Sequence, residues 1–367
     1  MKIKSLLLMS LVASMGFVSC NNEEPTPVEP QDQTPKSVTI KLPNMVQTRA
    51  TGDAIANNSK VELTNFKVFF LDGSGKEVTV PTYNDEAQKV YFQSTDPEWG
   101  GDVKELTYHF LPASTEKVVV VGNIGDAEYT SLATRVDDVP NDAPAHPSYP
   151  LYGESALAKG SAADDEGHAN VYTATVNLTP RVSRFEIYGF EYLGTKYTSV
   201  SLKKIALNHY YVKSNFVSMA PVEEGKVWAT ITESNAWDWV GTDAVAPWAD
   251  ELSLTLNAGE GKLVDGTTLT PEEDGEGTTG IITYGLAHVA DAANNPELIL
   301  TLEGTSGATA TPLYLKGTFT NATPFNAGKI YRVRYSFTDE DFEQPERCVE
   351  LSVTVAEWQV VPVTPEF

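Results

Sequence analysis

The chain has 367 residues, and its 26 basic and 50 acidic side chains give a formal net charge of −24 at pH 7. Such an acidic surface repels phosphate backbones, which disfavours nucleic acid as a partner. Only two cysteines are present, so no disulfide framework is expected and stability must come from buried core area. The length suffices for two domains of ordinary size.

The first 20 residues are typical of a secretory signal peptide. Lysines at positions 2 and 4 precede an apolar run over residues 6–18, which is too short to span a bilayer comfortably, and Ser19 and Cys20 follow. The stretch "FVSC" is similar to a lipobox, in which Cys20 becomes the first residue after cleavage and carries acyl chains such as palmitate. Each buried methylene would add about 0.8 kcal/mol to membrane binding. The alternative is a plain signal peptide in which the cysteine stands by chance.

Residues 21–49 are predicted to be a linker followed by a strand that is removed on maturation. The linker "NNEEPTPVEPQDQTP" is proline-rich and acidic and cannot build a core. In "SVTIKLP", Val38, Ile40 and Leu42 alternate with polar residues, as in a half-buried strand. A lone arginine, Arg49, then stands before Ala50 in "NMVQTRATGDA". It is either a solvated linker residue or the point where a trypsin-like protease cuts; the cut would leave 318 residues, 21 basic and 46 acidic, with a net charge of −25.

The rest of the chain has the period-2 alternation of strands, and helical spacing is scarce. The pattern predicts an all-β protein with short helical fragments over 125–139 and 290–297. The predicted strands cover residues 38–42, 61–71, 78–80, 89–92, 106–110, 117–123, 172–178, 182–188, 200–207, 227–231, 252–256, 281–284, 298–302, 313–319, 330–337, 349–355 and 358–363.

Turn residues divide these strands into two groups. "DGSG" at 72–75 predicts a hairpin connection, because glycine and aspartate reach positive φ easily. Stretches rich in Pro, Gly, Asp and Ala at 138–170 and 257–279 predict surface loops. No short-period repeat is present, which disfavours a propeller or solenoid. We place a domain boundary near Pro180, where "TPRVSRFEIYGF" begins a new run of strands. The expected domains span 50–180 and 181–367.

No pattern indicates an enzyme, and neither a cofactor nor a metal is expected. The five histidines lack an HExxH spacing. "DDEGH" at 164–168 is either a cation-binding cluster or a solvated acidic loop. "VVVVGNIGD" at 118–126 lacks the P-loop lysine and predicts a buried strand ending in a turn. Trp237, Trp239 and Trp248 form either a sugar-stacking platform or part of the packing, and Cys348 is expected to be a small core residue.

The C-terminal segment "CVELSVTVAEWQVVPVTPEF" changes the parity of its apolar residues. Val349, Leu351, Val353 and Val355 share one parity, whereas Trp358 and Val360 have the other, which predicts a bulge or crossover near Glu357. An unpaired apolar strand at the end of a chain invites aggregation, so a partner must receive it. The candidate donor residues are Trp358, Val360, Val361, Val363 and Phe367. They either close the molecule's own sandwich or pair with the next molecule.

The two ends together suggest an assembly mechanism. A cut after Arg49 would remove the covalent tie of the strand that holds Val38, Ile40 and Leu42. The strand could then leave a groove for a neighbour's strand, whose main-chain bonds would supply affinity. Until the cut, the tethered strand competes well because its effective concentration is high. A C-terminal strand donated from each subunit to the next is a heterologous contact, which grows into a filament.

In these features the sequence resembles the fimbrillin family, the type V pilins of Bacteroidales bacteria. The resemblance lies in the order of "FVSC", "QTRA", "VVVVGNI", "TPRVSRFEI", "AGKIYRVRYSF" and "VTVAEWQVVPVTPEF" along nearly the whole chain. It implies two transthyretin-like β-sandwich domains, export as an outer-membrane lipoprotein, and cleavage after Arg49 by an arginine-specific protease. It further implies a transient lipid anchor at Cys20 and strand exchange along the stalk of a cell-surface fimbria with roles in adhesion or biofilm formation.

Two other functions are compatible with the sequence. One is a monomeric surface lipoprotein that binds glycans through Trp237, Trp239 and Trp248. The other is a fimbrial tip adhesin, which accepts a strand and gives none; the C-terminal strand disfavours it. The presence of both a cleavage site and a donor strand favours a stalk subunit.

Overall fold

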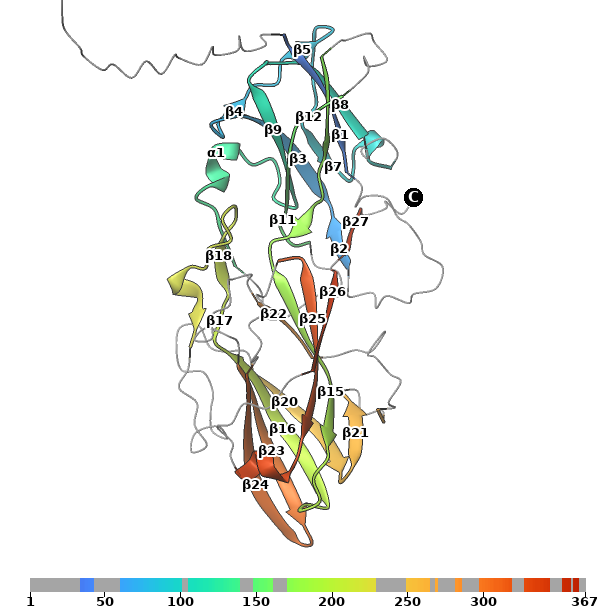
Figure 1. Ribbon diagram of the computed structural model, residues 1–367, viewed down its shortest axis with the longest axis vertical. Coiled ribbons are helices and arrows are strands. Elements are labelled where there is room, and N and C mark those ends of the chain that lie inside the picture. Colours follow the sequence, from blue (N-terminus) through green and yellow to red (C-terminus); the bar gives the residue numbers. More distant parts are fainter. Residues whose placement is uncertain are drawn as a thin grey trace, which may run out of the picture. The chain divides into compact units, whose positions relative to one another are not determined.

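The structure is a computed structural model. The described residues are 34–42, 60–100, 105–138, 148–160, 170–228, 249–264, 268–269, 281–285, 297–318, 327–343, 352–357 and 359–362. They form mostly strands and a few short helices, which confirms the predicted all-β class (Figure 1).

Two sheets contribute to a first hydrophobic core, whose members lie between residues 38 and 182. One sheet has the order β12-β13-β1-β8, and the other has the order β14-β11-β9-β3-β4 with β7 also paired to β3. The first sheet contains β1 (Lys36–Lys41), β8 (Glu105–Leu111), β12 (Ala158–Lys159) and β13 (Val171–Thr175). The second contains β3 (Asn65–Asp72), β4 (Glu77–Val78), β7 (Tyr91–Gln93), β9 (Thr115–Gly122), β11 (Leu151–Ala156) and β14 (Thr179–Pro180).

Two further sheets contribute to a second core, whose members lie between residues 187 and 337. The first has the order β21-β15-β25-β26, with β22 also paired to β15, and the second has the order β20-β16-β23-β24. The strands of the first are β15 (Ser183–Tyr192), β21 (Glu260–Leu263), β22 (Ile281–Gly285), β25 (Lys329–Phe337) and β26 (Ser352–Glu357). Those of the second are β16 (Ser199–Asn208), β20 (Ala249–Asn257), β23 (Glu297–Ser306) and β24 (Thr309–Thr318).

Smaller elements connect the sheets. Four strand pairs stand apart: β2 (Lys60–Leu63) with β27 (Gln359–Pro362), β5 (Thr82–Tyr83) with β6 (Glu86–Ala87), β10 (Val136–Asp138) with β18 (Lys213–Asn215), and β17 (Tyr210–Tyr211) with β19 (Lys226–Val227). The short helices are α1 (Tyr129–Leu132), α2 (Asp339–Glu343) and the 3₁₀ turns η3 (Pro97–Gly100) and η4 (Glu223–Gly225).

Strands β3 and β9 are apolar on both faces because each face meets a core. Phe66, Val68 and Phe70 belong to the first core, as do Val118 and Val120. The residues between them point the other way and pack with Leu132 of α1 and with Phe216, which follows β18; these are Phe69, Leu71, Val119 and Val121. Burial on both faces explains the unbroken run "VVVV", which alternation alone does not account for.

Several predicted local features are present. The "DGSG" turn joins β3 to β4, where Asp72 Oδ1 accepts hydrogen bonds from the amides of Ser74 and Lys76. The "VVVVGNIGD" strand is fully buried and ends in a turn with positive φ at Asn123 and Gly125. Near Glu357 the chain changes partners: β26 pairs with β25, and β27 pairs with β2.

Other expectations were wrong. The single strand predicted over 61–71 is two strands, because Thr64 directs its amide to Asn123 Oδ1 at 2.8 Å instead of to a neighbouring strand. The expected loop at 138–170 contains β11 and β12, and the loop at 257–279 contains β21. By contrast, the short helix expected within 125–139 is present as the four-residue α1, after which β10 begins. Residues 286–296, with most of the second predicted helix, lie outside the described residues.

Candidate functional site

Strand β1 is an interior strand of its sheet, although it comes from the N-terminal end of the described chain. It pairs in parallel with β13, where Thr39 lies opposite Thr173, and antiparallel with β8, where Thr39 lies opposite Thr107. An interior strand has hydrogen-bonded neighbours on both sides. Removal of β1 would therefore expose backbone groups of both neighbours along one gap.

The three apolar residues predicted on one face of this strand lie in the first core. Val38 and Ile40 are 0% exposed and Leu42 is 1% exposed, whereas Lys41 between them faces solvent. Full burial of such side chains contributes roughly 1.5 to 3 kcal/mol each. The strand is thus an integral part of the core, and its loss would open an apolar groove.

Polar contacts fix the register of β1 at its start. The Ser37 amide donates to Asn170 O at 3.0 Å, and Asn170 Nδ2 donates to Thr34 O at 3.1 Å. Lys36 Nζ donates to Thr115 O at 2.7 Å, and the same ammonium lies 4.7 Å from the centre of the Tyr172 ring.

Side-chain contacts and the far end of the strand complete this register. The Ser37 side chain is buried with its Oγ 3.4 Å from His109 Nδ1, and Thr39 Oγ1 lies 3.1 Å from Thr107 Oγ1. At the far end, the Val176 amide donates to Lys41 O at 2.9 Å. These contacts come from segments more than 60 residues away in sequence, so the pattern of β1 alone could not reveal them.

On the neighbouring strand β8, Tyr108 lies opposite Val38 and forms part of the same core. Its ring meets Phe70 edge to face at 5.0 Å between centroids, and its hydroxyl donates to Lys89 O at 2.8 Å. Burial raises the pKa of the Tyr108 phenol, so the ring stays neutral. Beside it, the Gln88 side chain donates to His109 O and accepts from His109 N, which occupies backbone groups of β8.

The predicted processing sites lie outside the described residues. This holds for Cys20, Arg49 and Ala50. Strand β1 ends at Lys41, and after Leu42 the described chain resumes at Lys60 in β2, so Arg49 belongs to the segment that connects these strands. Val61 and Leu63 of β2 are fully buried in the first core.

The C-terminal segment is described as two strands. β26 pairs antiparallel with β25 at the end of its sheet, and β27 pairs in parallel with β2. Of the predicted donor residues, Val360 lies opposite Val61 and Val361 lies opposite Glu62. Trp358, Val363 and Phe367 lie outside the described residues. The C-terminal strand thus pairs within its own chain here.

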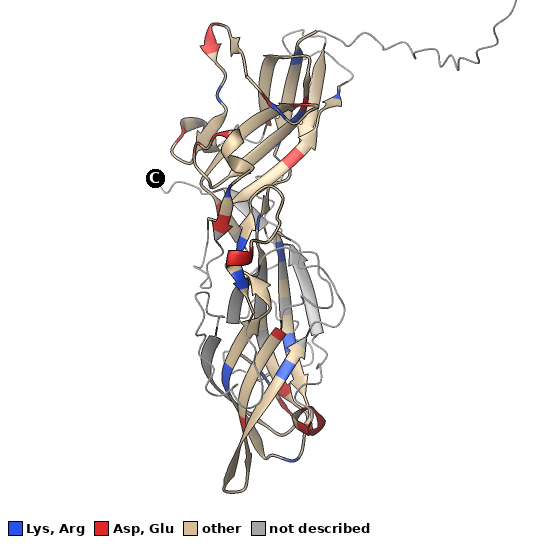
Figure 2. Ribbon diagram, turned by 90° about the vertical axis from the view of Figure 1, so that its left-hand side faces the viewer, with Lys and Arg blue, Asp and Glu red and all other residues tan. Residues whose placement is uncertain are grey.

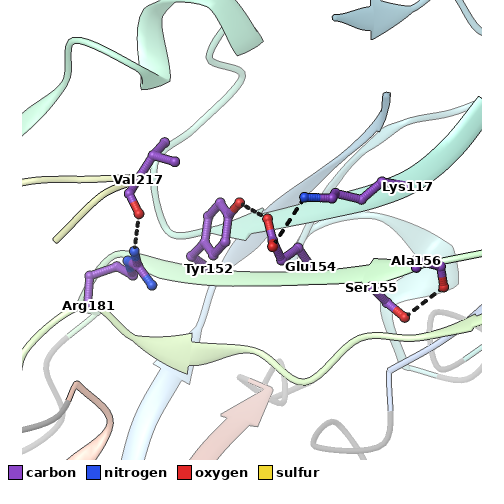
Figure 3. A network of polar contacts seen from close by, with 7 residues as sticks. All are labelled: Lys117, Tyr152, Glu154, Ser155, Ala156, Arg181 and Val217. Atoms are coloured by element: carbon purple, nitrogen blue, oxygen red, sulfur yellow. Dashed lines mark hydrogen bonds and ion pairs between the residues drawn. The ribbon is translucent and has the colours of Figure 1, made fainter. Parts of the chain in front are cut away.

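A polar network that the sequence did not reveal lies where β11 meets the segment after β18 (Figure 3). Arg181 donates to Phe216 O at 2.8 Å and to Val217 O at 2.7 Å, and its guanidinium lies 4.7 Å from the centre of the Tyr152 ring. Tyr152 Oη donates to Glu154 Oε2 at 2.6 Å, and Glu154 also meets Lys117. Burial, helped by Glu154, raises the pKa of the Tyr152 phenol.

The other candidate binding residues lie outside the described residues, and the described residues form no metal-binding cluster. "DDEGH" at 164–168, Trp237, Trp239, Trp248 and Cys348 lie outside the described residues. Among the described residues, no group of three or more His, Cys, Asp or Glu side chains could hold a metal ion. Figure 2 shows acidic and basic residues interspersed along the described ribbons. Within the part of the chain described, no helix is long and apolar enough to cross a bilayer.

The fold and this site define an all-β protein in which an interior strand, β1, is buried in a hydrophobic core. No family profile matches the chain, and no curated protein matches it. Solved structures similar to it include a candidate cell adhesion protein from Bacteroides eggerthii, with 16% identity, a TM-score of 0.46 and coverage of 90% of this chain and 98% of the other. A candidate cell adhesion protein from Parabacteroides distasonis has 14% identity, a TM-score of 0.48 and coverage of 92% and 100%.

A fimbrial assembly protein from Parabacteroides distasonis is also similar, with 15% identity, a TM-score of 0.39 and coverage of 89% and 96%. These structures are cell-adhesion and fimbrial proteins of Bacteroidales, the group named by the sequence resemblance.

Proposed function

We propose that the protein is a stalk subunit of cell-surface fimbriae that polymerises by strand exchange once an arginine-specific protease has cut after Arg49. The observation that carries this proposal is the position of β1, an interior strand with Val38, Ile40 and Leu42 in the core. Its connection to the rest of the molecule runs through the segment that contains Arg49. A cut there converts a covalently held core strand into one that can be exchanged.

The other proposed steps of assembly are membrane tethering, release and strand donation. Acylation of Cys20 tethers the exported precursor to the outer membrane, and the cut after Arg49 releases the chain from this lipid. The C-terminal segment of another subunit then fills the gap between β13 and β8. Related fimbrial subunits are the partners, and neither catalysis nor a cofactor takes part. The two hydrophobic cores correspond in this proposal to two domains that meet near Pro180.

Treatment of the purified precursor with an arginine-specific protease tests this proposal. We expect a new N-terminus at Ala50 and filaments in electron micrographs, and we expect neither from Arg49→Ala. A cleaved chain that stays monomeric by light scattering would overturn the stalk assignment. Measurements of glycan binding would then test the monomeric surface lipoprotein, and co-assembly with related subunits would test the tip adhesin.

A further inference from the structure

Two strands of this chain have nearly the same four-residue sequence. Residues 37–40 of β1 read Ser-Val-Thr-Ile, and residues 352–355, the start of β26, read Ser-Val-Thr-Val. We propose that in the fimbria residues 352–355 of one subunit take the places of residues 37–40 in the next, residue for residue and in the same direction. This inference rests on the proposed function and specifies its donor and register.

The side chains of β1 define what a replacement strand must supply. The places of Val38 and Ile40 are fully buried and apolar, and Val353 and Val355 are apolar β-branched residues of similar shape. The place of Ser37 is 3% exposed and lies beside His109 Nδ1, so it requires a small hydroxyl side chain.

The remaining matched position has a polar requirement. The place of Thr39 adjoins the Thr107 hydroxyl at 3.1 Å. Ser352 and Thr354 supply the hydroxyls at positions 37 and 39. Each of the four positions therefore finds the side-chain chemistry that it holds in β1.

A second stretch near the C-terminus resembles β1 in its side chains, but its prolines do not suit the backbone hydrogen bonding of this site. "PVTPEF", residues 362–367, aligns Val363 with Val38 and Phe367 with Leu42, yet it places Pro362 at position 37 and Pro365 at position 40. The Ser37 amide donates to Asn170 O, and proline has no N–H to donate. Proline is also confined to edge strands and bulges of sheets, whereas position 40 lies in a regularly paired part of an interior strand. The backbone therefore favours residues 352–355.

The position of β26 makes its release feasible. Among the described strands it pairs with β25 alone and stands last in its sheet, whereas in the place of β1 it would pair with both β13 and β8. In the gap, β26 would therefore form backbone hydrogen bonds with two neighbouring strands instead of one. The match ends after Ala356, because Glu357 would meet the buried place of Leu42 with a carboxylate that has no partner there. The residues from Trp358 onward then continue beyond the matched stretch.

Cysteine cross-linking tests the register. In a Cys348→Ser background, Thr107→Cys is combined with Thr354→Cys, which the proposal places opposite it. The matched variant combines Thr107→Cys with Thr364→Cys, the equivalent position in the proline-containing stretch. A third pair, Thr107→Cys with Thr39→Cys, should form a disulfide within the uncut precursor and shows that position 107 is reactive. Thermal melting confirms that each variant folds, and electron microscopy scores filaments separately.

After cleavage and mild oxidation, we expect the pair with Thr354→Cys to give a ladder of covalent oligomers on a non-reducing gel, and the pair with Thr364→Cys to give none. A ladder from the Thr364→Cys pair, or from neither pair although filaments form, would overturn the register and leave strand exchange intact. If the cleaved Cys348→Ser parent and the unmodified protein form no filaments, the proposed function fails and the register fails with it.

Discussion

Arg181 contacts both β11 and the segment after β18. Its guanidinium donates to two backbone carbonyls and stacks on Tyr152. Arg181→Ala would leave both carbonyls without these donors, and hydrogen bonds from charged groups contribute about 1.5 to 3 kcal/mol each. Because two such bonds are lost, we expect the free energy of unfolding to fall by about 3 to 6 kcal/mol in a urea titration. Arg181→Lys should recover only part of this, since an ammonium lacks the planar fork.

The matched control for this prediction is Lys117→Ala in the same network. Lys117 and Glu154 form an ion pair whose side chains are 41% and 47% exposed. Exposed pairs of this kind contribute little, so the change should stay within about 1 kcal/mol. Equal losses for Arg181→Ala and Lys117→Ala would contradict the role assigned to Arg181.

Asp339, at the start of α2, makes stability depend on pH. Burial raises the pKa of its carboxyl, but hydrogen bonds from Tyr192 and from the amides of Thr195 and Lys196 outweigh this effect and lower the pKa below its usual value. The folded state therefore binds this proton less readily than the unfolded state does. The resulting stability is complete above about pH 4, the unfolded value, and is lost as pH falls through the folded pKa.

Unfolding of Asp339→Asn in urea at pH 7 and pH 3 measures this contribution. We expect the variant to be less stable than the unmodified protein at pH 7, and the difference to shrink at pH 3. Glu340→Gln, at an exposed position of the same helix, is the matched control and should change the unfolding free energy little at pH 7. A deficit of Asp339→Asn that stays constant or grows on acidification would show that its carboxylate is not the cause.

At the scale of single elements, β1 should matter for the precursor and not for the fimbria. Ile40 is fully buried, and Ile→Ala substitutions in cores cost about 2 to 5 kcal/mol. We expect Ile40→Ala to lower the unfolding free energy of the precursor by such an amount in a urea titration. After cleavage it should leave the stability of filaments unchanged, because β1 is no longer part of them. Lys41→Ala, at an exposed position, is the control and should change neither.

Alternation predicted most strands, because their apolar faces cover a core. The face of Val38, Ile40 and Leu42 is an example in which the pattern alone fixes burial. Strand β11 was not predicted, because it contains Gly153, and glycine is not typical of the interior of a regular strand. That glycine is required by packing: a Cβ there would lie 2.5 Å from Asn177 O. Such a close approach depends on residues that come together only in the fold.

The partners of the candidate site were beyond prediction for the same reason. Asn170, His109 and Thr107 meet β1 across 68 to 133 residues of sequence. Arg181 lies in a motif that marked the start of a new run of strands, but its acceptors are backbone carbonyls, which every residue possesses. Arg181 stands between Pro180 and Val182, so no neighbouring aromatic residue signals its stacking on Tyr152, and nothing in the sequence selects Phe216 and Val217 as acceptors.

At the scale of the whole molecule, a subunit that accepts a strand but cannot donate one should end a filament. Deletion of residues 352–367 removes β26 and β27 and leaves β1 and its neighbours in place. We expect the cleaved variant to form no filaments alone and, mixed as a minor component with cleaved full-length subunits, to shorten their filaments in electron micrographs. The uncut variant, whose groove is still filled, is the control. Filament lengths that do not respond to the cleaved variant would contradict the assignment of donor and acceptor.

The interior position of β1 also bears on how such a fimbria would carry load. A donated strand in this gap would be bonded to β13 on one side and β8 on the other. Tension pulling the strand along its own axis would load both ladders in shear, so that many hydrogen bonds resist together. A strand peeled from a sheet edge gives way one bond at a time. Joints of the first kind would let a thin, non-covalent fibre withstand flow and drag at the cell surface.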